Sequence, residues 1–377
     1  MRQMKVFRKD GLARCGVINT LHAEVETPVF MPVGTHGTVK AITHKDLKDI
    51  GVRMILANAY HLYLKPGDRL IREMGGIHRF SGWDGPMLTD SGGYQVFSLG
   101  LLREIREEGV AFQSHIDGSR HFLTPEKAVE IQRNIGADIW MCLDECVQYP
   151  ASYEYTSESA GLTTRWAKRC KDAKIDKDYK LFGIVQGGFY KDLRIRSALE
   201  LREMEFDGYA IGGLSVGEPK GLMLEMLDAV LEHLPEDRPR YLMGMGLPED
   251  IIEGVRMGID MFDCVIPTRL ARNGNLFTWF GRINIKNAKY IKDGRPVDED
   301  CDCYVCRTYS RAYLRHLLVS HELTSFYLNT IHNIYFYAVF MKRIRDAINE
   351  GRFDSFYINF INQWKGGEKD EYSACNG

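Results

Sequence analysis

Residues 139–145 read Ile139-Trp140-Met141-Cys142-Leu143-Asp144-Glu145, an apolar run that ends in two acids. A run this short and this apolar is typical of a strand that is buried on both faces. Similar runs alternate with helical patterns along the chain, at residues 29–33, 54–57, 87–89, 139–143, 182–185, 209–211, 241–243 and 261–264. Eight such strands predict an α/β protein with the fold of a (β/α)8 TIM barrel.

Polar residues and glycines follow the predicted strands at their carboxyl ends. Asp90 comes directly after residues 87–89, and Gln186 after residues 182–185. The other positions of this kind are Asn58, His61, Ser91, Asp144, Glu145, Gly187, Gly212, Gly213, Gly244 and, inside the last strand, Asp263. Active sites of parallel barrels are built at that face. An open doubly wound sheet would show the same alternation, but no G-x-G-x-x-G motif follows the first strand.

The barrel is expected to fill residues 1–365 as a single domain. Helical patterns between the strands cover residues 45–50, 125–135, 156–173, 191–204, 222–234 and 248–257. A hairpin-like stretch at 109–122 interrupts the third unit and is expected to lie across the barrel mouth. After the eighth strand, we expect an inserted subdomain at about 273–335, and residues 366–377 read as a polar tail.

A cysteine cluster lies in the expected insert. Cys301, Cys303 and Cys306 fall within six residues, and His332 follows on a helical stretch. Three thiolates and one imidazole complete a tetrahedral zinc shell with no position left for water, so the pattern predicts a structural Zn²⁺ site. The alternative is three unrelated thiols and a core histidine.

Composition limits the class of protein. The chain has 377 residues, a net charge of -2, no apolar leader and no run long enough to cross a membrane, which favours a cytoplasmic globular protein. Nine cysteines suit a reducing compartment. Residues 269–316 carry a net charge of +5, so a polyanion could dock beside the cysteine cluster. A merely solvated charged surface explains the same charge equally well.

Two strand-end acids are candidates for cleaving a glycosidic bond. Such chemistry needs one carboxylate to attack or stabilise the sugar and another to move protons. Asp90, in the segment Thr89-Asp90-Ser91-Gly92-Gly93-Tyr94-Gln95, and Asp263, in an apolar strand end, form the pair that we choose. Each acid alone is more often a helix cap, but several that converge on one face favour chemistry.

A second group of residues suits recognition of a planar base. The Asp144 carboxylate can accept two parallel hydrogen bonds from a guanine edge, and the Gln186 amide offers both a donor and an acceptor. Gly212-Gly213-Leu214 would present bare backbone N–H groups, and Tyr94 could stack on the base. Gln186 could equally be a structural residue that satisfies a loop.

These motifs together resemble one enzyme family. Thr89–Gln95, Asp144-Glu145-Cys146, residues 183–188, residues 208–218, Phe262-Asp263-Cys264 and the cysteine cluster are similar, in this order, to tRNA-guanine transglycosylase, also called queuine tRNA-ribosyltransferase. The resemblance extends from about residue 7 to about residue 353. It implies a barrel enzyme that removes the wobble-position guanine in the anticodon loop of tRNAs with GUN anticodons and installs a 7-deazaguanine.

The resemblance also implies a role for each matching residue. Asp263 would be the nucleophile that forms a covalent ribosyl intermediate, and Asp90 the general acid/base. The base would be held by Asp144, Gln186, Gly213, Leu214 and Cys146, with Tyr94 and Met243 stacking on it. Arg269 and Arg272 would contact the nucleotides that flank the target, the zinc subdomain would hold phosphates, and the protein would be a homodimer.

Some positions depart from the family pattern and bear on the choice of substrate. Met141-Cys142-Leu143 replaces the Met-Ala-Phe of bacterial members, while His36 and Ala59 replace Gln and Thr. Cys146 and Val216 fit bacterial members, which accept 7-aminomethyl-7-deazaguanine rather than the bulkier queuine. Alternatives are the same reaction with queuine, a non-catalytic zinc-stabilised tRNA-binding subunit, and a barrel glycosidase that acts on sugars.

Overall fold

Eight parallel strands form the centre of the molecule in the computed structural model, which describes residues 4–93, 95–96 and 103–373. The strands are β4 (Val29–Pro32), β5 (Ile55–Ala57), β6 (Met87–Thr89), β10 (Ile139–Met141), β11 (Lys180–Val185), β12 (Gly208–Ile211), β13 (Arg240–Leu242) and β14 (Met261–Cys264). Their order is β4-β14-β13-β12-β11-β10-β6-β5, and a parallel bridge between Val33 and Leu56 joins the two ends. The predicted TIM barrel is therefore confirmed.

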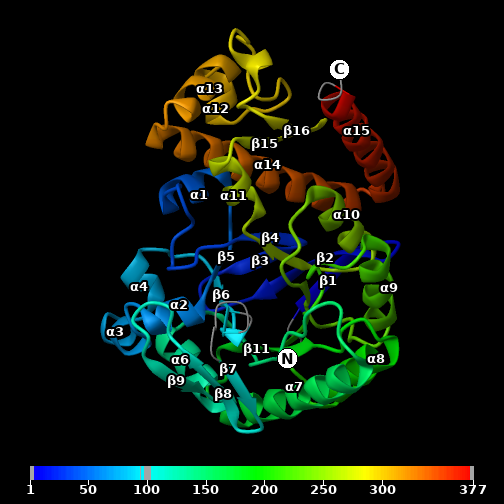
Figure 1. Ribbon diagram of the computed structural model, residues 1–377. Helices are drawn as coiled ribbons and strands as arrows, with labels where there is room; N and C mark the ends of the chain where they lie inside the picture. The colour runs from blue at the N-terminus through cyan, green and yellow to red at the C-terminus, as the bar shows by residue number, and fades with distance from the viewer. Residues whose placement is uncertain (1–3, 94, 97–102, 374–377) are drawn as a thin grey trace.

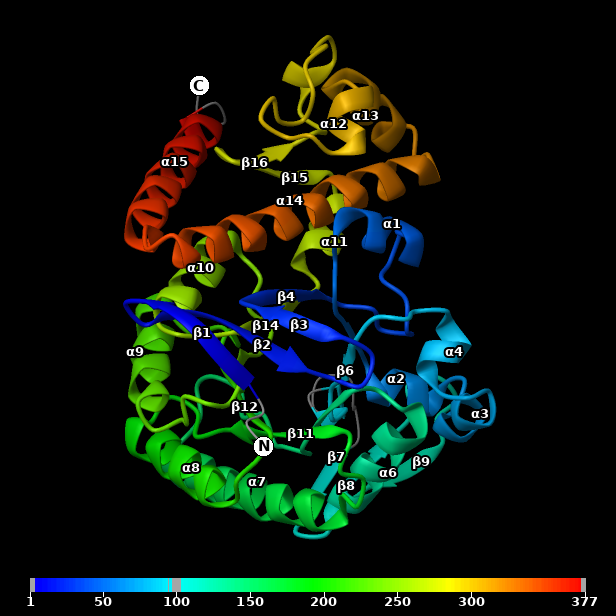
Figure 2. The same cartoon turned by 180° about the vertical axis from the view of Figure 1, so that it is seen from behind.

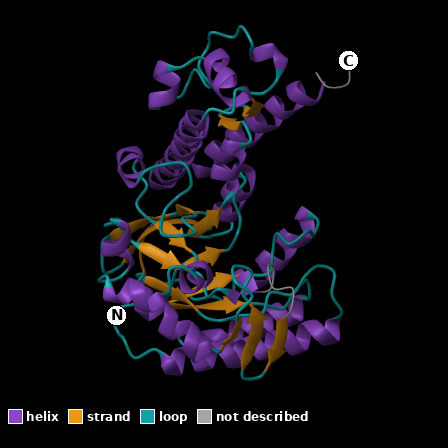
Figure 3. Cartoon of the chain, turned by 60° about the vertical axis from the view of Figure 1, so that its left-hand side comes forward, coloured by secondary structure: helices purple, strands orange, loops and turns teal. Residues whose placement is uncertain are grey.

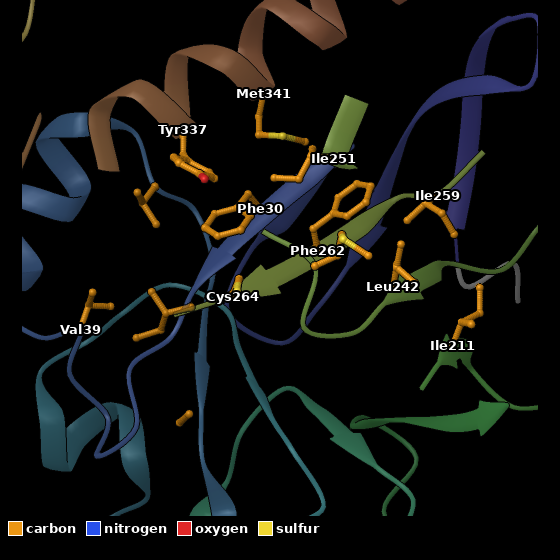
Figure 4. Close-up of a cluster of buried hydrophobic side chains, with 14 of the residues drawn as sticks. Phe30, Val39, Ile211, Leu242, Ile251, Ile259, Phe262, Cys264, Tyr337 and Met341 are labelled. Carbon is orange, nitrogen blue, oxygen red and sulfur yellow. The ribbon is translucent and has the colours of Figure 1, made fainter. Parts of the chain in front are cut away.

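Both faces of these strands are buried, which explains why they read as unbroken apolar runs. Alternate residues of β12 show the two environments: Ala210 points into the barrel, whereas Tyr209 and Ile211 pack outward. Figure 4 shows the outer layer, where Phe30 and Phe262 lie beneath side chains of the covering helices.

Helices surround the strands (Figure 3). The helices that alternate with the barrel strands along the chain are α1 (His44–Ile50), α6 (Pro125–Ile135), α7 (Tyr153–Ala173), α8 (Lys191–Glu203), α9 (Lys220–Leu231) and α10 (Pro248–Arg256). Three short helices follow β5: α2 (Ala59–Leu64), α3 (Asp68–Glu73) and α4 (Ile77–Ser81). The residues at the start of α6 show why this helix begins where it does: the Thr124 side chain accepts a hydrogen bond from the Lys127 amide, and Pro125 occupies the first turn.

An antiparallel sheet that the sequence analysis did not predict closes the amino-terminal end of the barrel. It consists of β1 (Met4–Asp10), β2 (Ala13–Asn19) and β3 (Glu24–Thr27), and Figure 2 shows it in front of the barrel strands. Met4, Ile18 and Val25 join the apolar cluster inside the barrel. The sheet therefore acts as an apolar plug.

The expected hairpin belongs to a second antiparallel sheet. Its strands are β7 (Arg103–Arg106), β8 (Gly109–Gln113) and β9 (Arg120–Leu123). His115, between β8 and β9, contacts the Tyr60 hydroxyl at 3.0 Å, and Trp166 of α7 donates to the Glu107 carbonyl at 2.8 Å. These contacts tie the sheet to α2 and α7.

The segment after β14 lies above the barrel in Figure 1, and one long helix of this segment also packs against the barrel. It contains α11 (Ile266–Arg272), β15 (Asn275–Thr278), β16 (Gly281–Asn284), η1 (Ala288–Tyr290), α12 (Tyr304–Thr308) and α13 (Arg311–Val319), followed by α14 (Leu323–Asn349) and α15 (Phe353–Ser373). The expected boundary at 335 falls inside α14, because this helix carries His332 and then packs Tyr337 on Phe30 of β4.

The backbone of α15 continues to Ser373, so residues 366–373, which read as part of a tail, are helical. Phe360 and Trp364 of α15 pack at 5.3 Å, and Trp364 also packs on Phe277 of β15. None of the helices in the described part of the chain combines the length and hydrophobicity that a membrane span requires.

Candidate active site and metal centre

Asp90 lies at the carboxyl end of β6, and the neighbouring strand end holds it in place. The Asn58 Nδ2 donates to Asp90 Oδ2 at 2.6 Å, and the Ala59 amide donates to Asp90 Oδ1 at 2.8 Å. Asn58 is fixed in turn, because its Oδ1 accepts from the His61 amide and caps α2. The Asp90 carboxylate is thereby oriented by two donors from the β5 unit.

Asp263 lies on β14 and is held by the adjacent β13 unit. The Tyr241 hydroxyl donates to Asp263 Oδ1 at 2.6 Å, and the Gly244 amide donates to the same oxygen at 2.8 Å. Within the described residues, Asp263 Oδ2 has no hydrogen-bond donor. One carboxylate oxygen is therefore anchored and the other keeps its lone pairs.

Burial perturbs both carboxyl groups. The pKa of Asp90 is raised to about 7, chiefly by loss of water and also by the negative charges of Asp263 and Asp144, while hydrogen bonds from the Ala59 and Gly92 amides oppose the shift. Burial also raises the pKa of Asp263, while the Gly244 amide and the Tyr241 hydroxyl oppose the shift. A carboxyl group with a pKa near 7 can both give and take a proton at neutral pH.

A third acid forms a separate polar group with Gln186. The Gln186 Nε2 donates to Asp144 Oδ2 at 2.8 Å, and the Ser91 hydroxyl donates to Asp144 Oδ1 at 3.3 Å. Burial raises the pKa of Asp144 to about 6. The Gln186 Oε1 is buried and has no hydrogen-bond partner in the described residues. An unpaired buried acceptor is costly, so this atom is suited to a ligand that supplies an N–H donor.

Glycines allow the backbone to approach this group closely. A Cβ on Gly213 would lie 2.4 Å from Gln186 Oε1, and a Cβ on Gly93 would lie 2.7 Å from the Asp144 carbonyl oxygen. The Gly213 φ of 63° is also one that glycine adopts without strain. The Leu214 amide has no hydrogen-bond acceptor in the described part of the chain, so it remains free to donate.

The remaining predicted residues lie around these groups. Met243, just past β13, packs against the apolar interior of the barrel. Burial raises the pKa of the Cys146 thiol to about 12. Arg269 is exposed on α11, and Arg272 on the same helix donates to the Thr268 carbonyl at 2.8 Å. Tyr94 lies outside the described residues.

The cysteine cluster has the dimensions of a metal site. The His332 Nδ1 lies 3.9, 3.5 and 3.4 Å from the sulfurs of Cys301, Cys303 and Cys306. The edge between sulfur and nitrogen in a tetrahedral zinc site is about 3.5 Å, given the usual bond lengths. His332 Nε2 lies 2.7 Å from the Phe277 carbonyl and donates to it, which leaves Nδ1 unprotonated toward the sulfurs. This cluster can hold a metal ion.

Comparison with known proteins agrees with this arrangement. The family model described as queuine tRNA-ribosyltransferase matches residues 9–366. A queuine tRNA-ribosyltransferase of Solidesulfovibrio magneticus is 60% identical over 92% of this chain and 94% of that protein. A protein of the same name from Pelotomaculum thermopropionicum is 59% identical over 94% of this chain and 96% of its own length. Another from Thermoanaerobacter sp. is 55% identical over 98% of this chain and 98% of its own length.

The chain belongs to the queuine tRNA-ribosyltransferase family.

In this member of the queuine tRNA-ribosyltransferase family, sequence reasoning missed several residues that position the acids. Tyr241 read only as part of an apolar strand, and its hydrogen bond to Asp263 has no sequence signal. Asn58 follows a predicted strand, but nothing in the sequence marks it as a partner of Asp90. Arg194 lies in the predicted helical stretch 191–204 and has no sequence signal of its own, yet its side chain is fully buried.

A second group of possible metal ligands lies at the opposite end of this barrel. His22 and His78 each contact one oxygen of Asp138, at 2.9 and 3.3 Å. Their rings are stacked at 3.5 Å with only 15° between the planes. Two parallel rings cannot both aim lone pairs at one ion, so this geometry fits hydrogen bonds to a buried carboxylate. The group ties the sheet β1–β3 and α4 to the start of β10.

Proposed function

We propose that this protein is a tRNA-guanine transglycosylase that replaces the wobble guanine of tRNAs with GUN anticodons by 7-aminomethyl-7-deazaguanine. The observation that carries the proposal is the pair of strand-end acids. Asp263 has one hydrogen-bonded and one free carboxylate oxygen, and its negative charge contributes to the raised pKa of Asp90. Family membership supports the same reaction. We further propose that the protein acts in the cytoplasm, where tRNA is modified.

The first half-reaction removes guanine. The free Oδ2 of Asp263 attacks C1′ of the ribose, the bond from C1′ to N9 breaks, and its electron pair goes to the base. Asp90, as the carboxylic acid, donates its proton to the departing guanine. The product is a ribosyl ester of Asp263, which keeps the tRNA attached while the bases exchange.

The second half-reaction runs the same steps in reverse with a new base. The Asp90 carboxylate takes the N9 proton of the incoming 7-deazaguanine, N9 attacks C1′, and Asp263 leaves as a carboxylate. Two displacements at one carbon retain its configuration. The pKa of Asp90, about 7, suits a group that must act as acid and then as base.

Recognition of the base is assigned to the second polar group. Asp144 accepts from the N–H groups on the guanine edge, the Gln186 amide pairs with the same ring system, and the Gly213 and Leu214 amides donate to its 6-oxo group. Met243 and Tyr94 stack on the base, and Cys146 lies beside it. Cys146 and Val216 favour 7-aminomethyl-7-deazaguanine; preferential incorporation of queuine would assign the alternative substrate.

The segment above the barrel is assigned to tRNA and to assembly. Arg269 and Arg272 contact nucleotides that flank the target, and the basic residues near the cysteine cluster bind phosphates. We propose that Cys301, Cys303, Cys306 and His332 hold one structural Zn²⁺, because a closed set of three thiolates and one imidazole is typical of such sites. Exposed Tyr304 and Tyr313 beside this centre support a homodimer that packs through it.

A single assay tests the function. Radiolabelled guanine is incubated with the protein and a tRNA that carries a GUN anticodon, and label in the tRNA is counted. We expect incorporation that depends on the wobble guanine. A zinc-stabilised binding subunit would bind the tRNA without exchange, and a sugar glycosidase would do neither.

A further inference from the structure

Arg194 joins the two loops that face the proposed base. It lies on α8 with a fully buried side chain. Its Nε donates to the Gly188 carbonyl at 2.6 Å, and its two terminal nitrogens donate to the Gly212 carbonyl at 3.1 Å. One of them also donates to the Gly213 carbonyl at 3.1 Å. One guanidinium therefore fixes the loop after β11 and the loop after β12.

The helix α8 is placed to hold both loops from behind. Ser197 lies one turn after Arg194, and its hydroxyl accepts from the Gln186 amide at 3.2 Å. A Cβ on Gly187 would lie 2.7 Å from the Arg194 amide nitrogen, so this loop tolerates only glycine against the helix. Both glycine loops are therefore shaped against one face of α8.

No carboxylate of the described residues forms an ion pair with this guanidinium. Another buried arginine shows the usual arrangement: Arg14 binds both oxygens of Asp260, at 2.9 and 2.6 Å. Burial lowers the pKa of Arg194 to about 10, which leaves it charged at neutral pH. A buried cation without a directly bound counter-ion is costly, and here three backbone carbonyls and the more distant charge of Glu218 compensate for it.

The carbonyls that Arg194 binds are conjugated to the amides that face the base. A hydrogen bond at the Gly212 carbonyl polarises the Gly213 N–H, and one at the Gly213 carbonyl polarises the Leu214 N–H. The Leu214 amide has no acceptor in the described chain and is available to a ligand. The Gly213 amide faces the Cys146 sulfur, a weak acceptor that the oxygen of a ligand can replace.

We propose that Arg194 is a positioning residue that polarises the Gly213 and Leu214 amides toward the 6-oxo group of the bound purine. The inference rests on the proposed function and deepens it. When the bond from C1′ to N9 breaks, its electron pair spreads through the ring onto the 6-oxo oxygen. Polarised donors stabilise that charge until Asp90 delivers its proton, as preorganised dipoles do at other developing anions.

The test compares Arg194→Lys with the wild-type enzyme, using guanine and 6-thioguanine as bases. The second base keeps the N–H groups that face Asp144 but carries sulfur, a weak acceptor, in place of the 6-oxo oxygen. Lysine keeps the charge and cannot reach three carbonyls. We expect guanine to bind about 10-fold more weakly to the variant, with a lower kcat, and 6-thioguanine to change by less than about twofold.

Arg14→Lys is the matched control, because it perturbs a buried arginine far from the base. It is expected to lower Tm and to leave the ratio of guanine to 6-thioguanine affinity unchanged. Equal losses for both bases in Arg194→Lys, or no loss, would overturn the proposal. If that variant does not fold, the wild-type affinities decide, since equal binding of the two bases contradicts donation to the 6-oxo group.

The same experiment separates this inference from the function on which it rests. A wild-type enzyme that exchanges no guanine into tRNA overturns the proposed function. If the wild-type enzyme exchanges guanine, but Arg194→Lys weakens the binding of guanine and of 6-thioguanine equally or not at all, only the proposed role of Arg194 is overturned.

Discussion

The two ends of this barrel treat buried acids in opposite ways. At the amino-terminal end, Asp260 is held by Arg14 and by the Arg240 amide, and Asp138 accepts from the Met87 amide as well as contacting two histidines. Hydrogen bonds from His78, His22 and Met87 lower the pKa of Asp138 despite its burial. At the carboxyl end, burial raises the pKa values of Asp90, Asp144 and Asp263.

This difference separates stability from chemistry within one fold. Acids with enough donors stabilise the closed end of the barrel. At the carboxyl end, burial outweighs the hydrogen bonds, so the three acids hold protons more readily. Asp263 Oδ2 and Gln186 Oε1 also have no hydrogen-bond partner in the described residues. Conserving the strands while varying the strand ends is how barrels separate the two tasks.

The largest expected effect is at the carboxyl end. Asp263→Asn should lower guanine exchange by at least about 1000-fold, because it removes the nucleophile. Its unfolding midpoint in urea should match or exceed that of the wild type. Exchange at more than a tenth of the wild-type rate would remove the nucleophile assignment.

Removal of the metal should leave both ends of the barrel intact. A strong chelator is expected to unfold the segment around Cys301–Cys306 and weaken tRNA binding, since metal binding in such sites is coupled to folding. Far-ultraviolet circular dichroism should lose only the helices near the cluster, and metal analysis should identify zinc. Full tRNA affinity in a metal-free preparation would refute the structural role.

The third expected effect is a loss of unfolding free energy at the amino-terminal end of the barrel. Asp260→Asn leaves the Arg14 guanidinium buried without its counter-ion, which costs about 3–5 kcal/mol of unfolding free energy. Urea denaturation measures that loss, and the exchange rate per folded molecule should stay close to the wild-type value. A large loss of kcat with unchanged stability would erase the contrast between the two ends.

The last expected effect is a gain in stability that fades to nothing as pH falls. Asp90 has a pKa raised from 3.8 to about 7, so the folded state binds a proton that the unfolded chain has already released between these values. Its contribution to stability is therefore present below pH 3.8 and is lost as pH rises to about 7. Asp90→Asn avoids this loss.

Asp90→Asn should consequently be more stable than the wild type at pH 8, by up to about 4 kcal/mol, and the gain should shrink toward pH 4. Urea denaturation at several pH values gives the difference directly. A gain that does not change with pH would show that the carboxyl group is not the source.

Sequence predicted the barrel well because its strands carry their own signal. Residues 87–89 and 261–264 match β6 and β14, since a strand buried on both faces must be apolar throughout. The sheet β1–β3 was missed because its strands are not apolar runs: β1 mixes Met4 and Val6 with charged residues, and β2 contains the buried Arg14. Only the contacts inside the barrel reveal the plug.

The residues of the candidate site also fall into those that the sequence could predict and those that it could not. The cluster that can hold a metal ion could be predicted because three of its four residues lie close together in sequence and their chemistry is specific. The strand-end acids could be proposed because the fold brings such ends together. Tyr241 and Arg194 could not, because each looks like an ordinary strand or helix residue until the three-dimensional contacts show what it binds.

Mass spectrometry of the covalent intermediate tests the central claim most directly. The wild-type enzyme is mixed with tRNA, denatured during turnover, digested with nuclease and protease, and searched for a ribosyl ester. The account predicts one ester, on the peptide that contains Asp263, and none in Asp263→Asn. An ester on Asp90, or rapid exchange with no ester at any acid, would contradict it.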